Sequence, residues 1–376
     1  MVATPISVLV NACTMPEEAT GIGVYAYELA AALARRDDCE VTFASTRPAP
    51  CGAASLLPPA SLAEGARRFS AIRLQLWTQF AVPGLLKRHD IDVYHGTEFT
   101  VPIASRRPRV ATVHDLAFVT APRLFHGWST KVYFRLMMDT ARTATCVVVP
   151  SEHVAGEVMR EFGVSSRRIH VVPLAAPASM RPASPAECAE VSTRLRLVRP
   201  YILCVGIWNR NKRIVDALRA IAVLRDRGVH VDLALTGKPA PYMSRHYDRE
   251  VARLGIADRV HFLGHVADRD LPGLYTGSTA LVFVSELEGF GLPPMEAMTC
   301  GTPAIVSSIP VLREHCEGAA LMVPRREASA VADAVETLLR SPDARAEWIG
   351  RGTERAAMYS WDLTAARTMA VYRTIL

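Results

Sequence analysis

The chain has 376 residues, of which 50% are apolar, 21% charged and 7% aromatic, and its net charge is +6. This length exceeds the size at which one hydrophobic core usually stops growing, so we expect two domains, and the composition fits an ordinary globular protein and not a disordered one. The modest positive charge does not indicate nucleic acid as a partner, and apolar runs such as 146–149 and 279–284 are too short to cross a bilayer.

From the N-terminus, apolar segments rich in β-formers alternate with segments of helical periodicity. Strands are predicted at 6–10, 41–44, 93–94, 110–113, 146–149, 169–172, 201–205, 231–235, 260–262, 280–284, 304–306 and 320–322. Helices are predicted at 23–34, 129–141, 153–162, 212–227, 243–254, 294–300 and 328–339. This alternation predicts an α/β protein with parallel sheets and helices on both faces.

Two features concern the environment of the chain. No basic segment precedes the apolar run 6–10, which is therefore typical of a core strand rather than a signal peptide. The eight cysteines form no CxxC pair, and several lie in apolar strands, which favours small buried side chains in a reducing compartment over disulfides or a zinc site. We therefore expect a cytoplasmic protein.

Residues 173–200 interrupt the alternation. They are rich in Pro, Ala and Ser, carry no strand signal, and are followed at 201–206 by the fresh strand pattern YILCVG. We place the domain boundary here, and predict two Rossmann-like, doubly wound domains facing across a cleft, at 1–175 and 176–361. Such sheets bind ligands at the carboxyl ends of their strands, so the cleft is the expected site.

A glutamate-flanked motif, Glu288-Gly-Phe-Gly-Leu-Pro-Pro-Met-Glu296, follows the predicted strand 280–284. Its prolines favour the first turn of a helix, its glycines let the backbone approach a ligand, and free N–H groups at a helix start can bind a diphosphate. One carboxylate is predicted in the loop and one in the first helical turn. Each can accept hydrogen bonds from vicinal hydroxyls of a sugar or ribose. The alternative is a pair of solvated surface acids.

Two further polar segments end predicted strands. The basic turn 206–213, GIWNRNKR, places Arg210 and Lys212 near a helix start, where cations are favourable when an anion lies between them. A solvated basic turn is the alternative. In 111–115, ATVHD, His114 is able to donate to a sugar hydroxyl or relay a proton; otherwise it is a structural histidine capped by Asp115.

Two short motifs carry weaker signals. Gly21-Ile-Gly23-Val-Tyr-Ala26 has the GxGxxA spacing of nicotinamide sites but lacks the tight turn and the acid after the second strand, so we expect either an anion-binding helix start or a plain loop. Asp268-Arg-Asp270 has the DxD form that some transferases use to bind a metal, but it precedes a helical run and is better explained as a helix cap.

The segment 285–304, SELEGFGLPPMEAMTCGTPA, closely resembles the signature of retaining family 4 glycosyltransferases, which have the GT-B fold. The resemblance extends to 263–266, 270–275, 112–115, 149–151 and the N-terminal loop, and to Trp361 before a final helix at about 362–376, which it implies packs back on the first domain. It thus covers nearly the whole chain. Many relatives carry an arginine where this chain has Ile207, so the resemblance leaves open whether Arg210 or another base supplies that charge.

The resemblance also implies roles for individual residues. Glu288 would contact hydroxyls of the donor sugar, Glu296 would bind the ribose, and Lys212 would bind the diphosphate. His114 would contact the donor sugar near the reacting carbon, and Gly21 and Gly23 in the N-terminal loop of the first domain would also bind the donor. Backbone amides of Phe290, Gly291 and Leu292 would lie near the sugar and the diphosphate. The residues His265 and Val266 would face the base.

The implied activity is retaining hexosyl transfer from a nucleotide-sugar co-substrate, with no metal and no cofactor. We expect GDP-mannose as donor, ahead of UDP-glucose, UDP-N-acetylhexosamines or a dTDP-deoxysugar, and a glycan or lipid-linked acceptor in surface polysaccharide or lipopolysaccharide synthesis. Transfer to a natural product, a sugar phosphorylase and a nucleotide-sugar epimerase are alternatives. A carbohydrate-binding module and a nicotinamide oxidoreductase are the more remote ones.

The segment 67–88 suggests a contact with the inner membrane face. Phe69, Ile72, Leu76 and Phe80 recur at helical spacing, with basic residues on both sides up to Lys87-Arg88. Such a face is able to lie on an anionic membrane, but a helix packed on its own core has the same periodicity, and we favour core packing.

Overall fold

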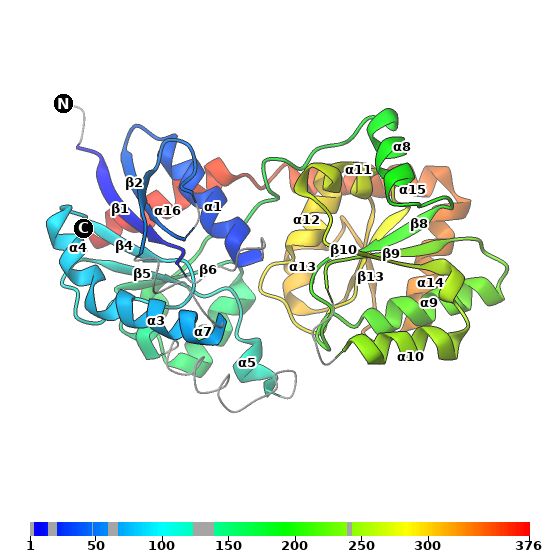
Figure 1. The fold of residues 1–376 in the computed structure, drawn as a ribbon, viewed down its shortest axis with the longest axis horizontal. Coiled ribbons are helices and arrows are strands. Elements are labelled where there is room, and N and C mark those ends of the chain that lie inside the picture. The colour runs from blue at the N-terminus through cyan, green and yellow to red at the C-terminus, as the bar shows by residue number, and fades with distance from the viewer. Residues whose placement is uncertain (1–3, 14–20, 47, 59–66, 123–138, 239–242) are drawn as a thin grey trace. The chain divides into compact units, whose positions relative to one another are not determined.

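The computed structural model describes residues 4–13, 21–46, 48–58, 67–122, 139–238 and 243–376, with side chains from residue 73 in the fourth of these ranges. The chain divides into two compact units (Figure 1). Unit 1 comprises residues 1–174 and 360–376, and unit 2 comprises residues 175–359. The predicted helix 129–141 lies almost wholly outside the described residues.

Within the described residues, unit 1 has a seven-stranded sheet of order β3-β2-β1-β4-β5-β6-β7, in which each recorded pair is parallel. Its strands are β1 (Ile6–Asn11), β2 (Cys39–Ala44), β3 (Ala54–Leu56), β4 (Val93–Gly96), β5 (Arg109–Thr112), β6 (Cys146–Val149) and β7 (Ile169–Val171). Its helices are α1 (Gly21–Ala34), α3 (Arg67–Phe80), α4 (Val82–Arg88), α5 (Ala117–Thr120), α7 (Glu152–Phe162) and α16 (Trp361–Ile375).

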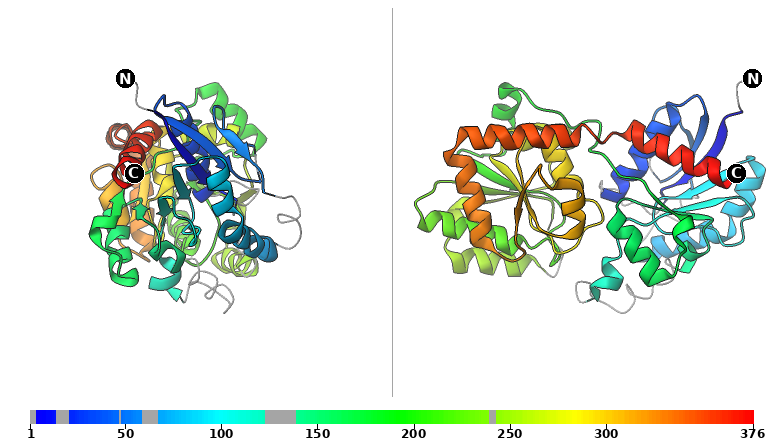
Figure 2. Two further views of the ribbon diagram at one scale, coloured as in Figure 1. Left: turned by 90° about the vertical axis from the view of Figure 1, so that its left-hand side faces the viewer. Right: turned by 180° about the vertical axis from the view of Figure 1, so that it is seen from behind.

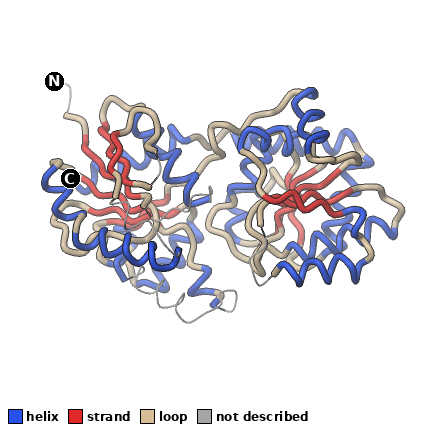
Figure 3. The backbone as a smooth tube through the Cα atoms, in the orientation of Figure 1, coloured by secondary structure: helices blue, strands red, loops and turns tan. Residues whose placement is uncertain are grey.

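Unit 2 has a six-stranded sheet in its described part, of order β10-β9-β8-β11-β12-β13, again parallel at every recorded pair. The strands are β8 (Tyr201–Cys204), β9 (Asp232–Thr236), β10 (Val260–Gly264), β11 (Ala280–Phe283), β12 (Ala304–Ser307) and β13 (Leu321–Val323). The helices are α8 (Pro185–Arg194), α9 (Ile214–Asp226), α10 (Ser244–Leu254), α11 (Leu271–Thr276), α12 (Leu292–Thr299), α13 (Pro310–Cys316), α14 (Ala328–Arg340) and α15 (Pro342–Ala356). In both units helices flank a central sheet, as Figures 2 and 3 show.

The sheets form from runs of apolar residues that are buried on both faces. β6, with the sequence CVVV, is buried at all four positions, as expected for a parallel strand covered by helices on either side. The helix that follows, α7, begins where Ser151 accepts a hydrogen bond from Val154 N–H and ends at Gly163 in the left-handed conformation. Local sequence therefore sets both ends of α7.

The C-terminal helix α16 packs on α1 in unit 1 (Figure 2). Ser360 caps its first turn by accepting from Leu363 N–H, and Tyr372 on its buried face is 2.5 Å from His95 Nδ1 in β4. His95 Nε2 is in turn 2.7 Å from Thr112 Oγ1 at the end of β5. A chain of buried hydrogen bonds thus connects the last helix to two central strands.

The sequence analysis did not predict α8, which lies in the segment 173–200 and begins at a capping box between Ser184 and Glu187. One expectation about this fold is wrong. The apolar face predicted on helix 67–80 is not a core face at Leu76 and Phe80, whose side chains are 52% and 81% exposed. Leu74 and Trp77 of α3 are buried instead, while the side chains of Phe69 and Ile72 lie outside those described.

Candidate active site

The candidate site in unit 2 lies where the strand order changes direction. β8 and β11 are neighbours in the sheet although they are far apart in the chain, and the loops at their carboxyl ends carry Lys212 and Glu288. This position is the topological switch point of a doubly wound sheet, where such sheets bind ligands. The topology therefore brings together the two most informative polar segments of the sequence.

Lys212 and Glu288 meet at this point. Lys212 Nζ donates to Glu288 Oε1 at 2.6 Å, and the two side chains are 22% and 14% exposed. Lys212 Nζ also lies 4.7 Å from the ring centre of Phe283, the last residue of β11. An ammonium group has three N–H donors, so two remain for a ligand, as does the second oxygen of the carboxylate. The pair can thus bind an anion and a hydroxyl side by side.

Arg210 and Ile207 occupy the same loop as Lys212. Both side chains are exposed, and among the described residues Arg210 has no recorded hydrogen bond or ion pair. Arg213, by contrast, donates two hydrogen bonds to Asp216, from Nη2 to Oδ1 at 2.8 Å and from Nε to Oδ2 at 2.9 Å. Arg210 is therefore the arginine of this turn whose guanidinium is available to an anion.

The loop between β11 and α12 turns tightly through Gly291. Its φ is 98°, and a Cβ added there would meet Leu312 Cδ2 at 2.7 Å, so the position requires glycine. Phe290 is buried, with its ring 4.3 Å from that of His315 and 5.8 Å from that of Tyr359. Among the first three residues of α12 only Leu292 has a backbone N–H, because Pro293 and Pro294 have none, so the backbone donors of this turn are those of Gly291 and Leu292. This is an arrangement suited to a phosphate group.

The sequence analysis predicted Glu296 in the first turn of its helix, and this prediction is wrong. The helix α12 begins at Leu292, two residues earlier than expected, so Glu296 lies beyond its first turn. Its carboxylate is buried and accepts from Tyr275 OH at 2.5 Å. Burial raises the pKa of Glu296, while the bond from Tyr275 lowers it. Tyr275, on α11, is thus a site neighbour that the sequence analysis did not identify.

Two residues predicted near the base follow β10 directly. His265 is exposed and Val266 is buried. Gly264 before them has a φ of 66°, and its carbonyl accepts from Gly237 N–H, which joins the ends of β9 and β10. These residues stand at the same carboxyl edge of the sheet as Lys212 and Glu288.

In unit 1, His114 follows the end of β5 and its exposed fraction is only 9%. Its Nε2 is 2.9 Å from the carbonyl oxygen of Thr97, and since a carbonyl only accepts, Nε2 must carry the hydrogen. Burial lowers the pKa of His114 to about 4, so the ring is neutral at pH 7 and Nδ1 is an acceptor. Its one ring N–H is therefore used by Thr97, and Nδ1 is left as a hydrogen-bond acceptor, not as the donor that the sequence analysis expected.

Two other parts of unit 1 bear on His114. Asp115 Oδ1 accepts from Ala117 N–H, and the ring of Tyr25 in α1 packs edge-on against His114, with ring centres 4.7 Å apart. Gly21 and Gly23 form the first turn of α1, so they open a helix as predicted. The segment 14–20 before them lies outside the described residues.

The Asp268–Asp270 segment forms a short 3-10 turn before α11. Asp270 stands at the N-cap position, yet its side chain makes no capping bond and instead accepts from Arg194 at 2.7 Å. The cap interpretation is thus wrong in its chemistry. Within the described ranges, no group of three or more His, Cys, Asp or Glu side chains is placed to hold a metal ion.

Comparison with known proteins identifies the family of this chain. The family model for glycosyltransferase family 4 matches residues 19–177, and the model for glycosyl transferases group 1 matches residues 190–355. A D-inositol 3-phosphate glycosyltransferase from Frankia alni is 30% identical over 72% of this chain and 69% of its own length. The chain belongs to glycosyltransferase family 4.

Two other relatives of this glycosyltransferase are named as O-antigen chain mannosyltransferases. It is 28% identical to O-antigen chain mannosyltransferase B of Escherichia coli, over 75% of this chain and 74% of the relative. It is 26% identical to O-antigen chain mannosyltransferase RfbU of Salmonella typhimurium, over 94% and 96% of the two chains. The resemblance to mannosyltransferases expected from residues 285–304 is confirmed.

Solved structures identify the fold. The sucrose-phosphate synthase of Thermosynechococcus elongatus superposes with a TM-score of 0.79 at 22% identity, covering 98% of each chain. A structure of HepE from Anabaena in complex with UDP and glucose superposes with a TM-score of 0.75 at 17% identity, covering 99% and 100%. The predicted GT-B fold of this glycosyltransferase is confirmed.

The helices of this glycosyltransferase were compared with the length and hydrophobicity that a bilayer requires. No helix within the described ranges is both long enough and apolar enough to span a bilayer.

Sequence analysis did not identify Thr97, Tyr25 and Tyr275 as site neighbours, although each contacts a candidate residue. A signal was present for Tyr25, inside the glycine-rich segment 21–26, and for Tyr275, inside the family-like segment 270–275, but not for Thr97, whose role depends on a tertiary contact.

Proposed function

We propose that this glycosyltransferase moves mannose from GDP-mannose to a glycan or lipid-linked acceptor in the synthesis of a surface polysaccharide or lipopolysaccharide. The observation that carries the proposal is the Lys212–Glu288 pair, 2.6 Å apart at the switch point of unit 2. A cation beside a carboxylate matches the two adjacent parts of a nucleotide-sugar, the diphosphate and the sugar hydroxyls. The O-antigen mannosyltransferases among its relatives support mannose.

The proposed reaction retains the anomeric configuration and uses neither a metal nor a cofactor. The bond between the anomeric carbon and the diphosphate breaks while the acceptor hydroxyl approaches from the same face and passes its proton to the departing phosphate. Lys212, the backbone amides of Gly291 and Leu292 and the exposed Arg210 would stabilise the charge that develops on the diphosphate. His114 Nδ1 would accept from a hydroxyl of the donor sugar, and Glu296 would bind the ribose.

The first test is thermal unfolding in the presence of GDP, UDP, dTDP and ADP, because a ligand that binds only the folded state raises its stability by mass action. GDP should give the largest rise in melting temperature, and GDP-mannose should then be consumed when a glycan or lipid-linked acceptor is added. A larger rise with UDP would replace mannose by another sugar. No rise with any of the four would contradict nucleotide-sugar binding itself.

A second acceptor class has support from one relative. The Frankia alni protein is named for D-inositol 3-phosphate, so a phosphorylated polyol belongs in the acceptor panel. Natural products belong there as well. Release of a sugar phosphate with inorganic phosphate, or epimerisation without an acceptor, would instead indicate a phosphorylase or an epimerase.

We also propose peripheral contact with an anionic membrane through the end of α3. Leu76, Phe80 and Ile103 are large apolar side chains that are at least half exposed. Gln79 joins α3 to the segment that carries Ile103, since its side chain donates to Val101 O and accepts from Ile103 N–H, both at 2.9 Å. Exposed cations lie nearby in the chain, at Lys87 and Arg88 in the last turn of α4 and at Arg106. A lipid-linked acceptor would be reached from such a surface.

A further inference from the structure

Asn211 joins the two loops that carry Lys212 and Glu288. Its side-chain Oδ1 accepts from Leu287 N–H at 2.9 Å, and its Nδ2 donates to Leu287 O at 2.8 Å. Its backbone carbonyl accepts from Glu286 N–H, also at 2.9 Å. Asn211 thus binds both backbone groups of the residue that directly precedes Glu288, and its own neighbour in the chain is Lys212.

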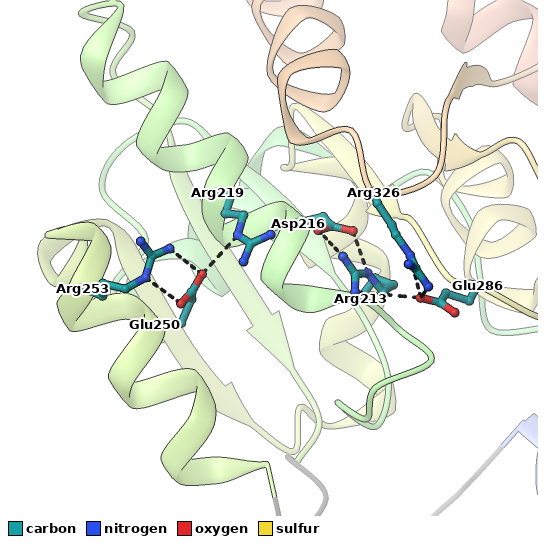
Figure 4. A network of polar contacts seen from close by, with 7 residues as sticks. All are labelled: Arg213, Asp216, Arg219, Glu250, Arg253, Glu286 and Arg326. Carbon is teal, nitrogen blue, oxygen red and sulfur yellow. Dashed lines mark hydrogen bonds and ion pairs between the residues drawn. The ribbon is translucent and has the colours of Figure 1, made fainter. Parts of the chain in front are cut away.

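The two residues that follow Asn211 also contact this loop. Lys212 contacts Glu288, and Arg213 Nη1 lies 3.8 Å from Glu286 Oε1. Arg326 donates to the same Glu286 oxygen at 2.8 and 3.1 Å, so the carboxylate of Glu286 is held from a second side (Figure 4). Three consecutive residues, 211–213, therefore hold three consecutive residues, 286–288, and the Lys212–Glu288 contact is one of the three.

The chemistry of this contact selects for asparagine. A carboxamide offers one donor and one acceptor with the spacing of a peptide group, so it satisfies the N–H and the C=O of one residue together. Aspartate would keep the acceptor but place a negative charge against the carbonyl of Leu287. Alanine would leave both backbone groups without this partner, and buried groups of that kind are costly to leave unpaired.

We propose that Asn211 is a positioning residue that sets the distance between Lys212 and Glu288, an inference that rests on the proposed function of that pair. The two catalytic candidates come from loops after different strands, and three hydrogen bonds of Asn211 fix one loop against the other. A displacement of about 1 Å in a catalytic group is able to cost about a hundredfold in rate. Loss of the side chain should therefore affect turnover more than donor binding.

The test compares Asn211→Ala and Asn211→Asp with Tyr201→Phe in the full chain. Tyr201 OH donates to Leu274 O at 2.8 Å, in the same unit but at the opposite end of β8, so its loss removes a buried hydrogen bond without touching residues 285–288. We expect kcat to fall between about ten- and a hundredfold in both Asn211 variants, on the order given for misplaced groups. The Kd for the nucleoside diphosphate should change by less than about threefold, and Tyr201→Phe should keep the turnover of the wild type.

Hydrogen exchange of the peptide covering 285–290 provides a second readout that needs no activity. Exchange there should be faster in Asn211→Ala than in the wild type or Tyr201→Phe. Unchanged exchange would overturn the inference, as would unchanged kcat in either Asn211 variant or an equal loss of kcat in Tyr201→Phe. Should the alanine variant not fold, the aspartate variant, which keeps the volume and the bond from Leu287 N–H, decides. A wild type without nucleotide binding would refute the proposed function instead, and the exchange comparison would still test the contact.

Discussion

Lys212 Nζ lies 2.6 Å from Glu288 Oε1 although the two residues are 76 positions apart in the chain. Each side chain is partly withdrawn from water, so each charge depends on the other in the absence of a ligand. This contact gives a first prediction about the reaction.

Replacing either partner of this pair should lower turnover by two orders of magnitude or more, while the fold remains intact. We expect Lys212→Met and Glu288→Gln each to reduce kcat by about a hundredfold, the range found when one group that stabilises transition-state charge is removed. The double variant should lose less than the sum of the two, because each single change leaves an unpaired charge. Steady-state kinetics on the four proteins measures this coupling.

A matched surface pair provides the control for that experiment. Arg227 and Glu336 form a 2.9 Å ion pair between α9 and α14, in the same unit. Arg227→Met and Glu336→Gln should leave kcat near that of the wild type and change the free energy of unfolding by less than about 1 kcal/mol. Near-normal transfer by both Lys212→Met and Glu288→Gln would contradict the assignment of the pair.

Gly291→Ala should destabilise unit 2 and weaken nucleotide binding. The residue has a φ of 98°, and the added methyl would meet Leu312 Cδ2 at 2.7 Å. The left-handed conformation alone costs a non-glycine residue about 1–2 kcal/mol. Gly350→Ala is the matched control, since a Cβ there meets nothing within 4 Å and the residue lies inside α15. That change should stabilise the helix by about 0.5–1 kcal/mol. Urea unfolding of the two variants distinguishes them, and equal effects would argue against a required turn at Gly291.

Much of the fold was predictable because parallel strands buried on both faces are continuous apolar runs. The strand at 146–149 has the bounds predicted from CVVV, and the other predicted strands lie within two residues of those observed. β3 was not predicted, because Ala54–Leu56 is a short edge strand with exposed positions and no apolar pattern. α8 was missed although Ser184, Pro185 and Glu187 form a capping signature, because the surrounding Pro- and Ala-rich segment was interpreted as a linker.

The candidate site was predictable in its residue types but not in its contacts. Strand ends followed by Lys212, Glu288 and His114 indicated chemistry at the carboxyl edges of the sheets. That Asn211 binds Leu287, or that Tyr275 binds Glu296, depends on which strands are neighbours and how their loops meet. Periodicity and composition contain no information about such pairings between distant segments.

Stability should fall as the pH drops from about 6.5 toward 4, because three histidines are buried in the neutral form. Burial lowers the pKa of His95 to about 3, and of His114 and His315 to about 4. An unfolded histidine titrates near ~6.5, so the unfolded chain binds more protons than the folded chain in this range. Each histidine then contributes up to about 1.4 kcal/mol of destabilisation per pH unit, and above pH 6.5 its contribution is constant.

The contribution of a single histidine to this slope can be isolated in unit 2. His315→Gln should flatten the dependence of unfolding free energy on pH between 6.5 and 4, measured by urea titration. His230→Gln is the control substitution, since it replaces a solvent-exposed histidine in the same unit. Equal slopes for the wild type and the His315 variant would show that this histidine does not titrate differently on unfolding.

Phe80→Ser should weaken binding to anionic vesicles by about tenfold or more, because burying a phenylalanine side chain in an apolar layer is worth about 1.5–3 kcal/mol. Phe80 is 81% exposed at the end of α3, next to Gln79, which holds Ile103 beside it. Val198→Ser is the matched control, since Val198 is 92% exposed but lies in unit 2, away from α3 in the chain. Co-sedimentation with phosphatidylglycerol vesicles should decrease for Phe80→Ser alone and should weaken as salt is added, because Lys87 and Arg88 would contribute electrostatically. Equal binding of Phe80→Ser and Val198→Ser to phosphatidylglycerol vesicles would place the membrane contact elsewhere. Binding of the wild type to neutral phosphatidylcholine vesicles as strong as to phosphatidylglycerol vesicles would exclude a contact that depends on anionic lipid.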